Sequence, residues 1–174
     1  RPGKLHQLIS GCARNNIDVV GVQEHRWQTT EQVDTHISRI DEASWRFEYS
    51  SATPEGHGGV GLLIGPKLIN FFSSSEKVSN RILLTHFKGN PAITIITAYA
   101  PTEDKDDSEK DAFYDDLQQV TNDVPQHNVL ILLGDLNARL GANSHQMNPR
   151  VSGRHTYHEQ THDNGNRLVS YCEA

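Results

Sequence analysis

The sequence has few of the residues and patterns that mark membrane or disulfide-stabilised proteins. Of its 174 residues, one is methionine, two are tryptophan and two are cysteine. No apolar stretch approaches the length that spans a bilayer, and none resembles a signal peptide. The hydrophobic fraction of 35% and the mean hydropathy of −0.61 are typical of a polar chain rich in loops. The sequence therefore predicts a single domain over residues 1–174, with no membrane partner.

The two cysteines, Cys12 and Cys172, form no metal-binding or redox motif. Each falls on an apolar face, which predicts buried free thiols and an intracellular, reducing compartment. The chain opens with Arg1-Pro2-Gly3 and has no methionine at that point. We therefore expect it to be part of a larger polypeptide.

Positive charge is scarce, and the net charge of −6 argues against indiscriminate binding to nucleic acids. The charge is unevenly spread, however. The segment Glu103–Asp123 contains nine acidic residues and two lysines, a net charge of −7, which leaves +1 for the rest of the chain. Outside this one segment the surface is close to neutral, so a polyanionic substrate is compatible with the composition.

Apolar periodicity predicts a mixture of helices and strands. Helices are expected over residues 3–15, 31–40 and 108–124, and strands over 17–22, 45–50, 60–64, 82–87, 92–100 and 129–133. The polar stretch 141–163 predicts a long loop, and Asn164-Gly165 predicts a turn before an ordered segment. Some strands alternate with helices while others follow one another directly. This order favours a layered α/β sandwich over a doubly wound sheet.

The strongest candidate site follows the apolar run Val129–Leu133. Its length and the Gly134 that ends it predict a strand buried on both faces. Asp135 and Asn137 come next, and in an extended chain residues two apart point to the same side. A carboxylate and a carboxamide placed in this way suit a hard cation or a phosphate. The alternative is ordinary turn chemistry, because Asp, Asn and Gly are common at strand ends.

Two other expected strands end in polar residues suited to the same chemistry. Glu24 follows the first strand, and Tyr99 lies near the end of the fifth. If these strands neighbour Val129–Leu133 in one sheet, the side chains converge. Glu24 and Asp135 would then offer anionic oxygens to Mg²⁺ or Mn²⁺, and Tyr99 would donate a hydrogen bond to a phosphoryl oxygen. The alternatives are a loop acid for Glu24 and a core phenol for Tyr99.

Three motifs, in this order, resemble the endonuclease/exonuclease/phosphatase superfamily. They are Gly21-Val22-Gln23-Glu24, Tyr99-Ala100-Pro101-Thr102 and Gly134-Asp135-Leu136-Asn137-Ala138. Within this superfamily, the sequence is most similar to one subgroup. That subgroup is the endonuclease domains of non-LTR retrotransposons and the craniofacial development protein 2-like proteins derived from them. The resemblance to it lies in residues 18–27, 58–61, 81–83 and 163–168. The resemblance covers nearly the whole chain. It implies a DNase I-like α/β sandwich, with two mixed β-sheets packed together and helices on the outer faces.

The resemblance also implies a role for each candidate residue. Glu24 matches the metal-binding glutamate of the family, and Tyr99 matches the active-site tyrosine near the scissile phosphate. Asp135 matches the aspartate that positions or activates the attacking water, and Asn137 matches the asparagine that contacts the phosphate or that water. The implied reaction is hydrolysis of a DNA phosphodiester assisted by Mg²⁺, or alternatively Mn²⁺, in the nucleus.

Four further residues, Arg26, Trp27, Asn164 and Arg167, are candidates for contact with DNA. Arginine and aromatic side chains suit contacts to the backbone and stacking on bases. The alternatives are packing for Trp27 and turn formation for Asn164.

The resemblance places two family elements outside residues 1–174, so the domain is expected to be truncated at both ends. They are the first strand, with its asparagine ligand, and a final Ser-Asp-His segment. The chain then holds about half of the catalytic set of the family. Two alternatives to a DNA endonuclease stay open: a phosphatase or lipid phosphodiesterase of the same fold, and a domesticated, non-catalytic binding module.

Overall fold

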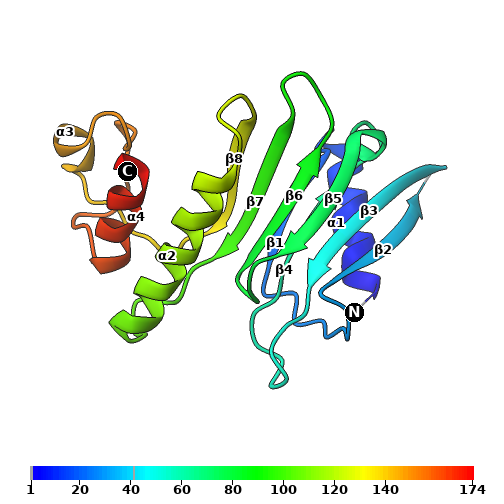
Figure 1. Cartoon of the computed structure of the whole chain (residues 1–174), viewed down its shortest axis with the longest axis horizontal. Helices are drawn as coiled ribbons and strands as arrows, with labels where there is room; N and C mark the ends of the chain where they lie inside the picture. The colour runs from blue at the N-terminus through cyan, green and yellow to red at the C-terminus, as the bar shows by residue number, and fades with distance from the viewer. Residues whose placement is uncertain (1, 41) are drawn as a thin grey trace. The chain divides into compact units, whose positions relative to one another are not determined.

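The computed structural model describes residues 2–40 and 42–174, so Arg1 lies outside the described residues (Figure 1). The chain divides into two compact units. The first contains residues 1–98 and 124–134, and the second contains residues 99–123 and 135–174. Within the described residues, no helix is both long and apolar enough to cross a membrane.

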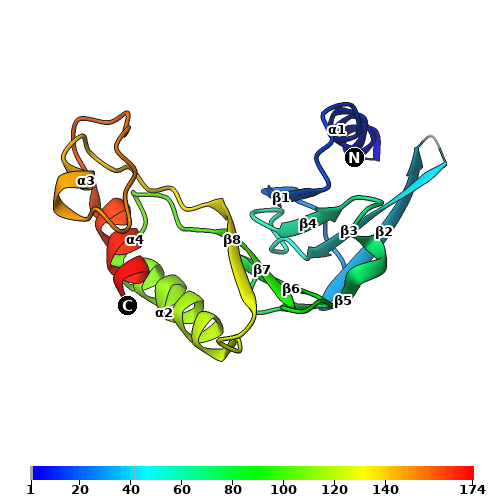
Figure 2. The same ribbon diagram turned by 90° about the horizontal axis from the view of Figure 1, so that it is seen from above.

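The first sheet of the first unit has the strand order β1-β4-β3-β2, and its strands pair antiparallel. The strands are β1 (Val19–Gln23), β2 (Val33–Ile40), β3 (Ala43–Ser50) and β4 (Val60–Ile64). Helix α1 (Pro2–Arg14) covers the outer face of this sheet (Figure 2). Its buried side chains Leu5, Ile9 and Cys12 recur at helical spacing and pack against β3. This apolar stripe explains why the predicted first helix forms.

The second sheet has the order β5-β6-β7-β8. Its strands are β5 (Phe72–Lys77), β6 (Ile82–Phe87), β7 (Ile93–Tyr99) and β8 (Val129–Asp135), and the 3₁₀ helix η1 (Ile69–Phe71) precedes β5. The amide of Val129 donates to Ala92 O and the amide of Ala100 donates to Asp135 O, so β8 runs parallel to β7. β5–β6 and β6–β7 pair antiparallel.

The two sheets pack face to face across an apolar core. Leu62 and Ile64 of β4 contact Phe87 of β6 and Ile95 of β7, and all four side chains are buried. Burial of this apolar surface is the main force that holds the layers together. The α/β sandwich of two packed β-sheets, expected from the family resemblance, is confirmed, but of the two sheets only the second is mixed, because the described strands of the first pair only antiparallel.

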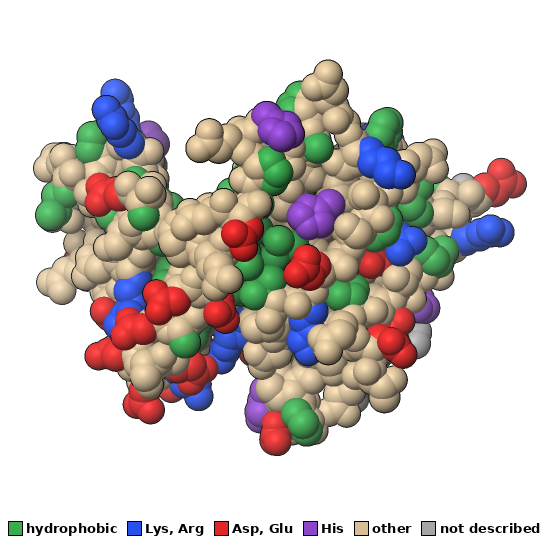
Figure 3. Space-filling view, in the orientation of Figure 1, with side chains coloured by type: hydrophobic (Ala, Val, Ile, Leu, Met, Phe, Trp, Pro, Cys, Tyr) green, Lys and Arg blue, Asp and Glu red, His purple; other side chains and the backbone are tan. Residues whose placement is uncertain are grey.

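The second unit contains α2 (Asp107–Asp123), α3 (Ser144–Met147) and α4 (Asp163–Glu173). Figure 3 shows acidic side chains gathered over α2. Some of this charge is neutralised within the unit. The guanidinium of Arg167 on α4 pairs with Asp107, Asp111 and Asp163, and Lys110, buried on α2, lies 3.2 Å from Asp163. The acidic segment is therefore a structural partner of α4.

Residues 33–40 form the strand β2, so the helix expected over residues 31–40 is wrong. The β-branched residues Val33, Thr35 and Ile37 suit a strand, and they pair with β3 from Val33 opposite Ser50 to Ile40 opposite Ala43. Pairing with β3 overrides the weak helical spacing. The expectation also omitted β5, whose sequence FSSSEK lacks an apolar pattern.

Three other expectations are corrected by the structure. Val129–Leu133 is not buried on both faces: β8 ends its sheet, and Val129 and Ile131 are 42% and 37% exposed. Asn164-Gly165 lies in the first turn of α4, because His162 Nδ1 accepts a hydrogen bond from the Gly165 amide and caps the helix. Both cysteines are free, but Cys172 is exposed whereas Cys12 is buried.

Candidate functional site

The strands β7 and β8 are neighbours in one sheet, as expected for Tyr99 and Asp135, whereas β1, which precedes Glu24, lies in the other sheet. Strand β1 packs face to face against β7 and β8. A Cβ atom on Gly21 would lie 3.2 Å from Leu133 Cβ and 3.4 Å from Thr97 Cγ2. Each of these three residues stands two positions before the last residue of its strand. The three strands are therefore packed together near their carboxyl ends, although they belong to two layers.

Glu24 directly follows β1 in the first unit and is exposed. Its φ angle is +52°, and that of Arg26 is +60°. Left-handed backbone at a residue other than glycine costs roughly 1–3 kcal/mol and persists only where the surroundings enforce it. The enforcing contacts come from the alternate residues, His25 and Trp27. The His25 ring packs edge-on against Trp27, Phe47 and Tyr49, and the Trp27 amide donates to His25 Nδ1 at 3.0 Å.

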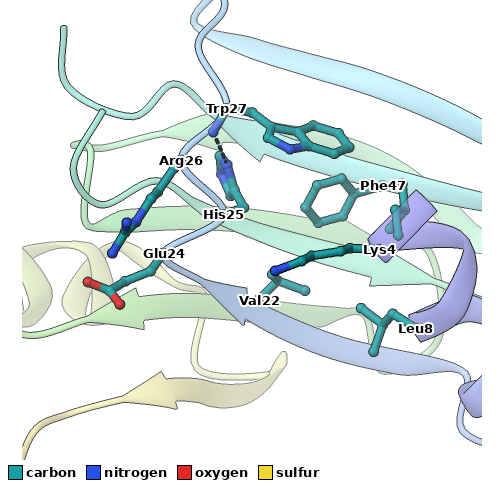
Figure 4. Close-up of a pocket in the computed structure, with 9 residues that line it drawn as sticks. Lys4, Leu8, Val22, Glu24, His25, Arg26, Trp27 and Phe47 are labelled. Atoms are coloured by element: carbon teal, nitrogen blue, oxygen red, sulfur yellow. Dashed lines mark hydrogen bonds between the residues drawn. The ribbon is translucent and has the colours of Figure 1, made fainter. Parts of the chain in front are cut away.

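A cavity of about 680 Å³ lies beside this strained segment (Figure 4). Leu5, Leu8, Val22, Trp27 and Phe47 provide its apolar lining, and its polar lining comes from Lys4, Glu24, His25 and Arg26. Burial lowers the pKa of His25, so its imidazole is neutral at pH 7. The cavity therefore combines an apolar surface with one carboxylate and two cations, which suits a flat group that carries an anion.

The other three predicted residues, Tyr99, Asp135 and Asn137, belong to the second unit, where the ends of β7 and β8 are cross-linked. The Ala100 amide donates to Asp135 O at 2.9 Å, and Asn137 Nδ2 donates to Ala100 O at 2.8 Å. The Asn137 amide donates to Asp135 Oδ1 at 2.9 Å. These bonds hold the exposed Asp135 carboxylate at a fixed place beside the chain that follows Tyr99.

Asp135 is the last residue of β8, and the chain then turns, so that Asn137 does not continue the extended strand. Asn137 has a φ of +46°, which asparagine tolerates well, and its amide closes a turn on the Asp135 carboxylate. Gly134 makes this geometry possible, because a Cβ there would overlap the carbonyl oxygen of Ala98. The turn chemistry considered as an alternative is thus present, and it positions the Asp135 carboxylate.

The four candidates for DNA contact lie in different environments. Arg26 is exposed at the cavity, whereas Trp27 is half-buried and packs edge-on against Phe47 and Tyr49. Asn164 is fully buried, and Arg167 pairs with three carboxylates of the second unit. Of the four, Arg26 has the side chain most open to a ligand.

Two residues outside the predicted site, Glu103 and His162, hold α4 in place. The Glu103 carboxylate accepts hydrogen bonds from the amides of Asp163 and Asn164, at 3.0 and 3.1 Å. His162 caps the same helix and lies 3.4 Å from Glu103. An acid followed by an apolar face at Asp163 is a local signal that could have indicated the helix start, whereas the distant partner Glu103 carries no local signal.

Each unit contains a predicted site carboxylate of the chemical type that binds divalent cations. Glu24 in the first unit and Asp135 in the second offer exposed carboxylate oxygens, the ligand type that Mg²⁺ prefers. Among the described residues, no group of three or more His, Cys, Asp or Glu side chains is arranged to hold a metal ion.

The fold is a two-layer sandwich with acid, amide and phenol side chains at or just beyond the ends of three strands. Residues 1–168 match the endonuclease/exonuclease/phosphatase family, and the chain belongs to that family, whose members are usually hydrolases.

Two curated relatives are similar to nearly all of this chain. Craniofacial development protein 2 of Bos taurus is 29% identical over 172 residues, and that of Tragulus javanicus is 28% identical over 172 residues. Each alignment covers 98% of this chain but only 27% or 28% of the relative, so the chain spans little more than a quarter of their length. No solved structure matches the chain.

Proposed function

We propose that the chain is the endonuclease domain of a retrotransposon-type protein and nicks DNA by hydrolysing a phosphodiester. The observation that carries the proposal is the cross-linked turn at the ends of β7 and β8, which fixes Asp135 and Asn137. A carboxylate held in this way positions a water molecule without the entropic cost of ordering itself during the reaction. The family membership supports the same chemistry.

The Asp135 carboxylate would orient the attacking water and accept its proton. Asn137 donates one hydrogen from Nδ2 to Ala100, so its second amide hydrogen and its Oδ1 would contact the phosphate or the water. Tyr99 would donate its phenolic hydrogen to a phosphoryl oxygen. A fixed donor to developing charge is typically worth about 10²–10³ in rate.

Glu24 would be a ligand of Mg²⁺ or Mn²⁺. The bound cation would supply Lewis acidity, which polarises the phosphoryl group and stabilises the leaving oxygen. The strained backbone at Glu24 supports a functional role, because strain of this kind clusters at sites where geometry serves function.

DNA is the proposed substrate, and the cavity beside Glu24 is its proposed contact surface. Arg26 and Lys4 would bind phosphate oxygens, and Trp27 would contact a base or sugar. The net acidity of the chain does not oppose this, since residues 103–123 account for all of it. A DNA substrate would place the protein in the nucleus.

Supercoiled plasmid, incubated with the protein and Mg²⁺, tests the proposal. We expect nicked circles to form, and the substitutions Glu24→Ala and Asp135→Ala to reduce the rate by roughly 10²-fold or more. Glu76→Ala and Asp116→Ala are matched controls, because both remove an exposed acid away from the candidate site. Nicking that survives both site substitutions contradicts the proposal. Plasmid binding without nicking favours a non-catalytic module, and hydrolysis of phosphomonoesters or phospholipids alone favours the other same-fold enzymes.

A further inference from the structure

Asn164, in the first turn of α4, has a fully buried side chain that connects two loops of the second unit. Its Nδ2 donates to Pro101 O at 2.9 Å and to Asn137 O at 3.2 Å. Pro101 lies two residues after Tyr99, and Asn137 closes the turn on Asp135. One amide nitrogen thus bridges the chain beyond β7 and the chain beyond β8.

The orientation of the Asn164 amide is determined by its surroundings. Nδ2 faces two carbonyl oxygens, whereas Oδ1 is buried and makes no hydrogen bond to the described residues. Rotation of the amide by half a turn would bring Oδ1 against both carbonyl oxygens. Two donated hydrogens are therefore required at this point, and neither an aspartate carboxylate nor an aliphatic side chain provides them.

The backbone of Asn164 is anchored independently of its side chain. Its amide donates to Glu103 Oε2, and its carbonyl oxygen accepts from the Tyr114 hydroxyl at 3.4 Å. The next residue is glycine, because a Cβ on Gly165 would overlap the carbonyl oxygen of Arg139. The side chain of Asn164 is thus presented to the two loops by a helix end that is itself fixed.

We propose that Asn164 is a positioning residue, which sets the separation between the Tyr99–Pro101 loop and the Asp135–Asn137 turn. The assignment of these loops to a reaction rests on the proposed function. Asn164 acts through Asn137, whose own Nδ2 continues the connection to Ala100 O. The Asn164 side chain is fully buried, so it acts by positioning and not by contact with DNA, which needs an exposed side chain.

The substitutions Asn164→Ala and Asn164→Asp test this role in the whole chain by two readouts. The first is hydrogen exchange at the amides of Ala100 and Asn137, which we expect to accelerate at least tenfold. The second is plasmid nicking, in which kcat should fall roughly 10–100-fold while KM stays within about twofold, because loss of alignment affects the reaction more than binding.

Two control variants separate positioning from a general loss of stability. Tyr114→Phe removes the bond to the Asn164 carbonyl, and Thr121→Ala removes a 2.6 Å bond between α2 and Tyr171 of α4. Both leave the Nδ2 bonds intact and should leave exchange at Ala100 and Asn137 unchanged. The positioning role is overturned if hydrogen exchange at Ala100 and Asn137 accelerates as much in Thr121→Ala as in the Asn164 variants. It is also overturned if exchange accelerates in neither Asn164 variant. If the unsubstituted chain does not nick plasmid, the proposed function fails, while the exchange readout still decides the role of Asn164.

Discussion

At the scale of single residues, Glu24 and Arg26 adopt left-handed backbone while the residue between them, His25, packs inward. The aromatic cluster of Trp27, Phe47 and Tyr49 fixes the His25 ring. The side chains of Glu24 and Arg26, on either side of His25, are therefore turned outward together. The strain is therefore a consequence of a well-packed interior, and it places a carboxylate beside a cavity.

The strain at Glu24 predicts a substitution that stabilises the fold and removes activity. Glycine adopts positive φ without cost, so Glu24→Gly should raise the free energy of unfolding by about 1 kcal/mol. It should also reduce plasmid nicking by roughly 10²-fold, since the carboxylate is lost. Urea unfolding and the nicking assay measure the two effects.

Glu42→Gly is a matched control for Glu24→Gly, because Glu42 is also exposed and has a φ of +64°. It should stabilise the protein similarly and leave nicking unchanged. If both glycine variants retain full activity, the strained backbone at Glu24 has no link to function.

At the scale of elements, the ion pairs between α2 and α4 make part of the stability dependent on pH. Hydrogen bonds from Arg167, and secondly from Lys110, hold the pKa of Asp163 below its ordinary value of 3.8. A carboxyl whose pKa is lower in the folded state stabilises the fold fully above its unfolded pKa. That stabilisation is lost as the pH falls through the folded pKa.

The expected result is a loss of stability in acid that depends on Asp163. As the pH falls below about 5, the free energy of unfolding should fall more steeply for the unsubstituted protein than for Asp163→Asn, with most of the difference arising below pH 3.8. Urea titrations across this range measure the difference. Asp116→Asn, a change at an exposed acid on α2, should follow the unsubstituted curve, and parallel curves for all three proteins would refute the assignment.

Another element, β8, ends its sheet with Val129 and Ile131 exposed. An apolar edge strand is a template for pairing with other chains. Ile131→Lys should therefore slow aggregation, measured by light scattering, and change the free energy of unfolding by no more than about 1 kcal/mol. Ser74→Lys adds the same charge on β5, at the other edge of the sheet. An equal effect of both substitutions would point to net charge and not to the edge strand.

At the scale of the whole molecule, the layered sandwich was predictable because its core strands are short apolar runs bounded by glycine and proline, as in Val60–Ile64. The assignment of strands to sheets was not, since β1, β7 and β8 meet through side-chain packing that no local pattern encodes. Residues 33–40 were predicted as helix because Val33, Ile37 and Ile40 also fit helical spacing, and only their pairing with the next strand, β3, decides for a strand. Exposure of β8 was missed because an apolar run does not reveal what covers it.

The candidate site was predictable to a similar extent. Asp135 and Asn137 were identified from a strand-end motif, and the turn that they form was one of the alternatives considered. The buried bridge made by Asn164 could not be foreseen, because its partners Pro101 and Asn137 are distant in sequence. Glu103 was likewise hidden in an acidic segment in which no single residue stands out.

We propose that DNA hydrolysis depends on both Glu24 and Asp135, and this dependence is central to the proposed function. It is tested most directly by the plasmid-nicking rates, in Mg²⁺, of the unsubstituted chain, Glu24→Ala, Asp135→Ala and the double variant. Residues that act as a unit have strongly non-additive effects. The double variant should therefore be no slower than the slower single variant. The proposal would be contradicted if the fold-reduction in nicking rate of the double variant equalled the product of the two single reductions. It would also be contradicted if neither substitution reduced nicking.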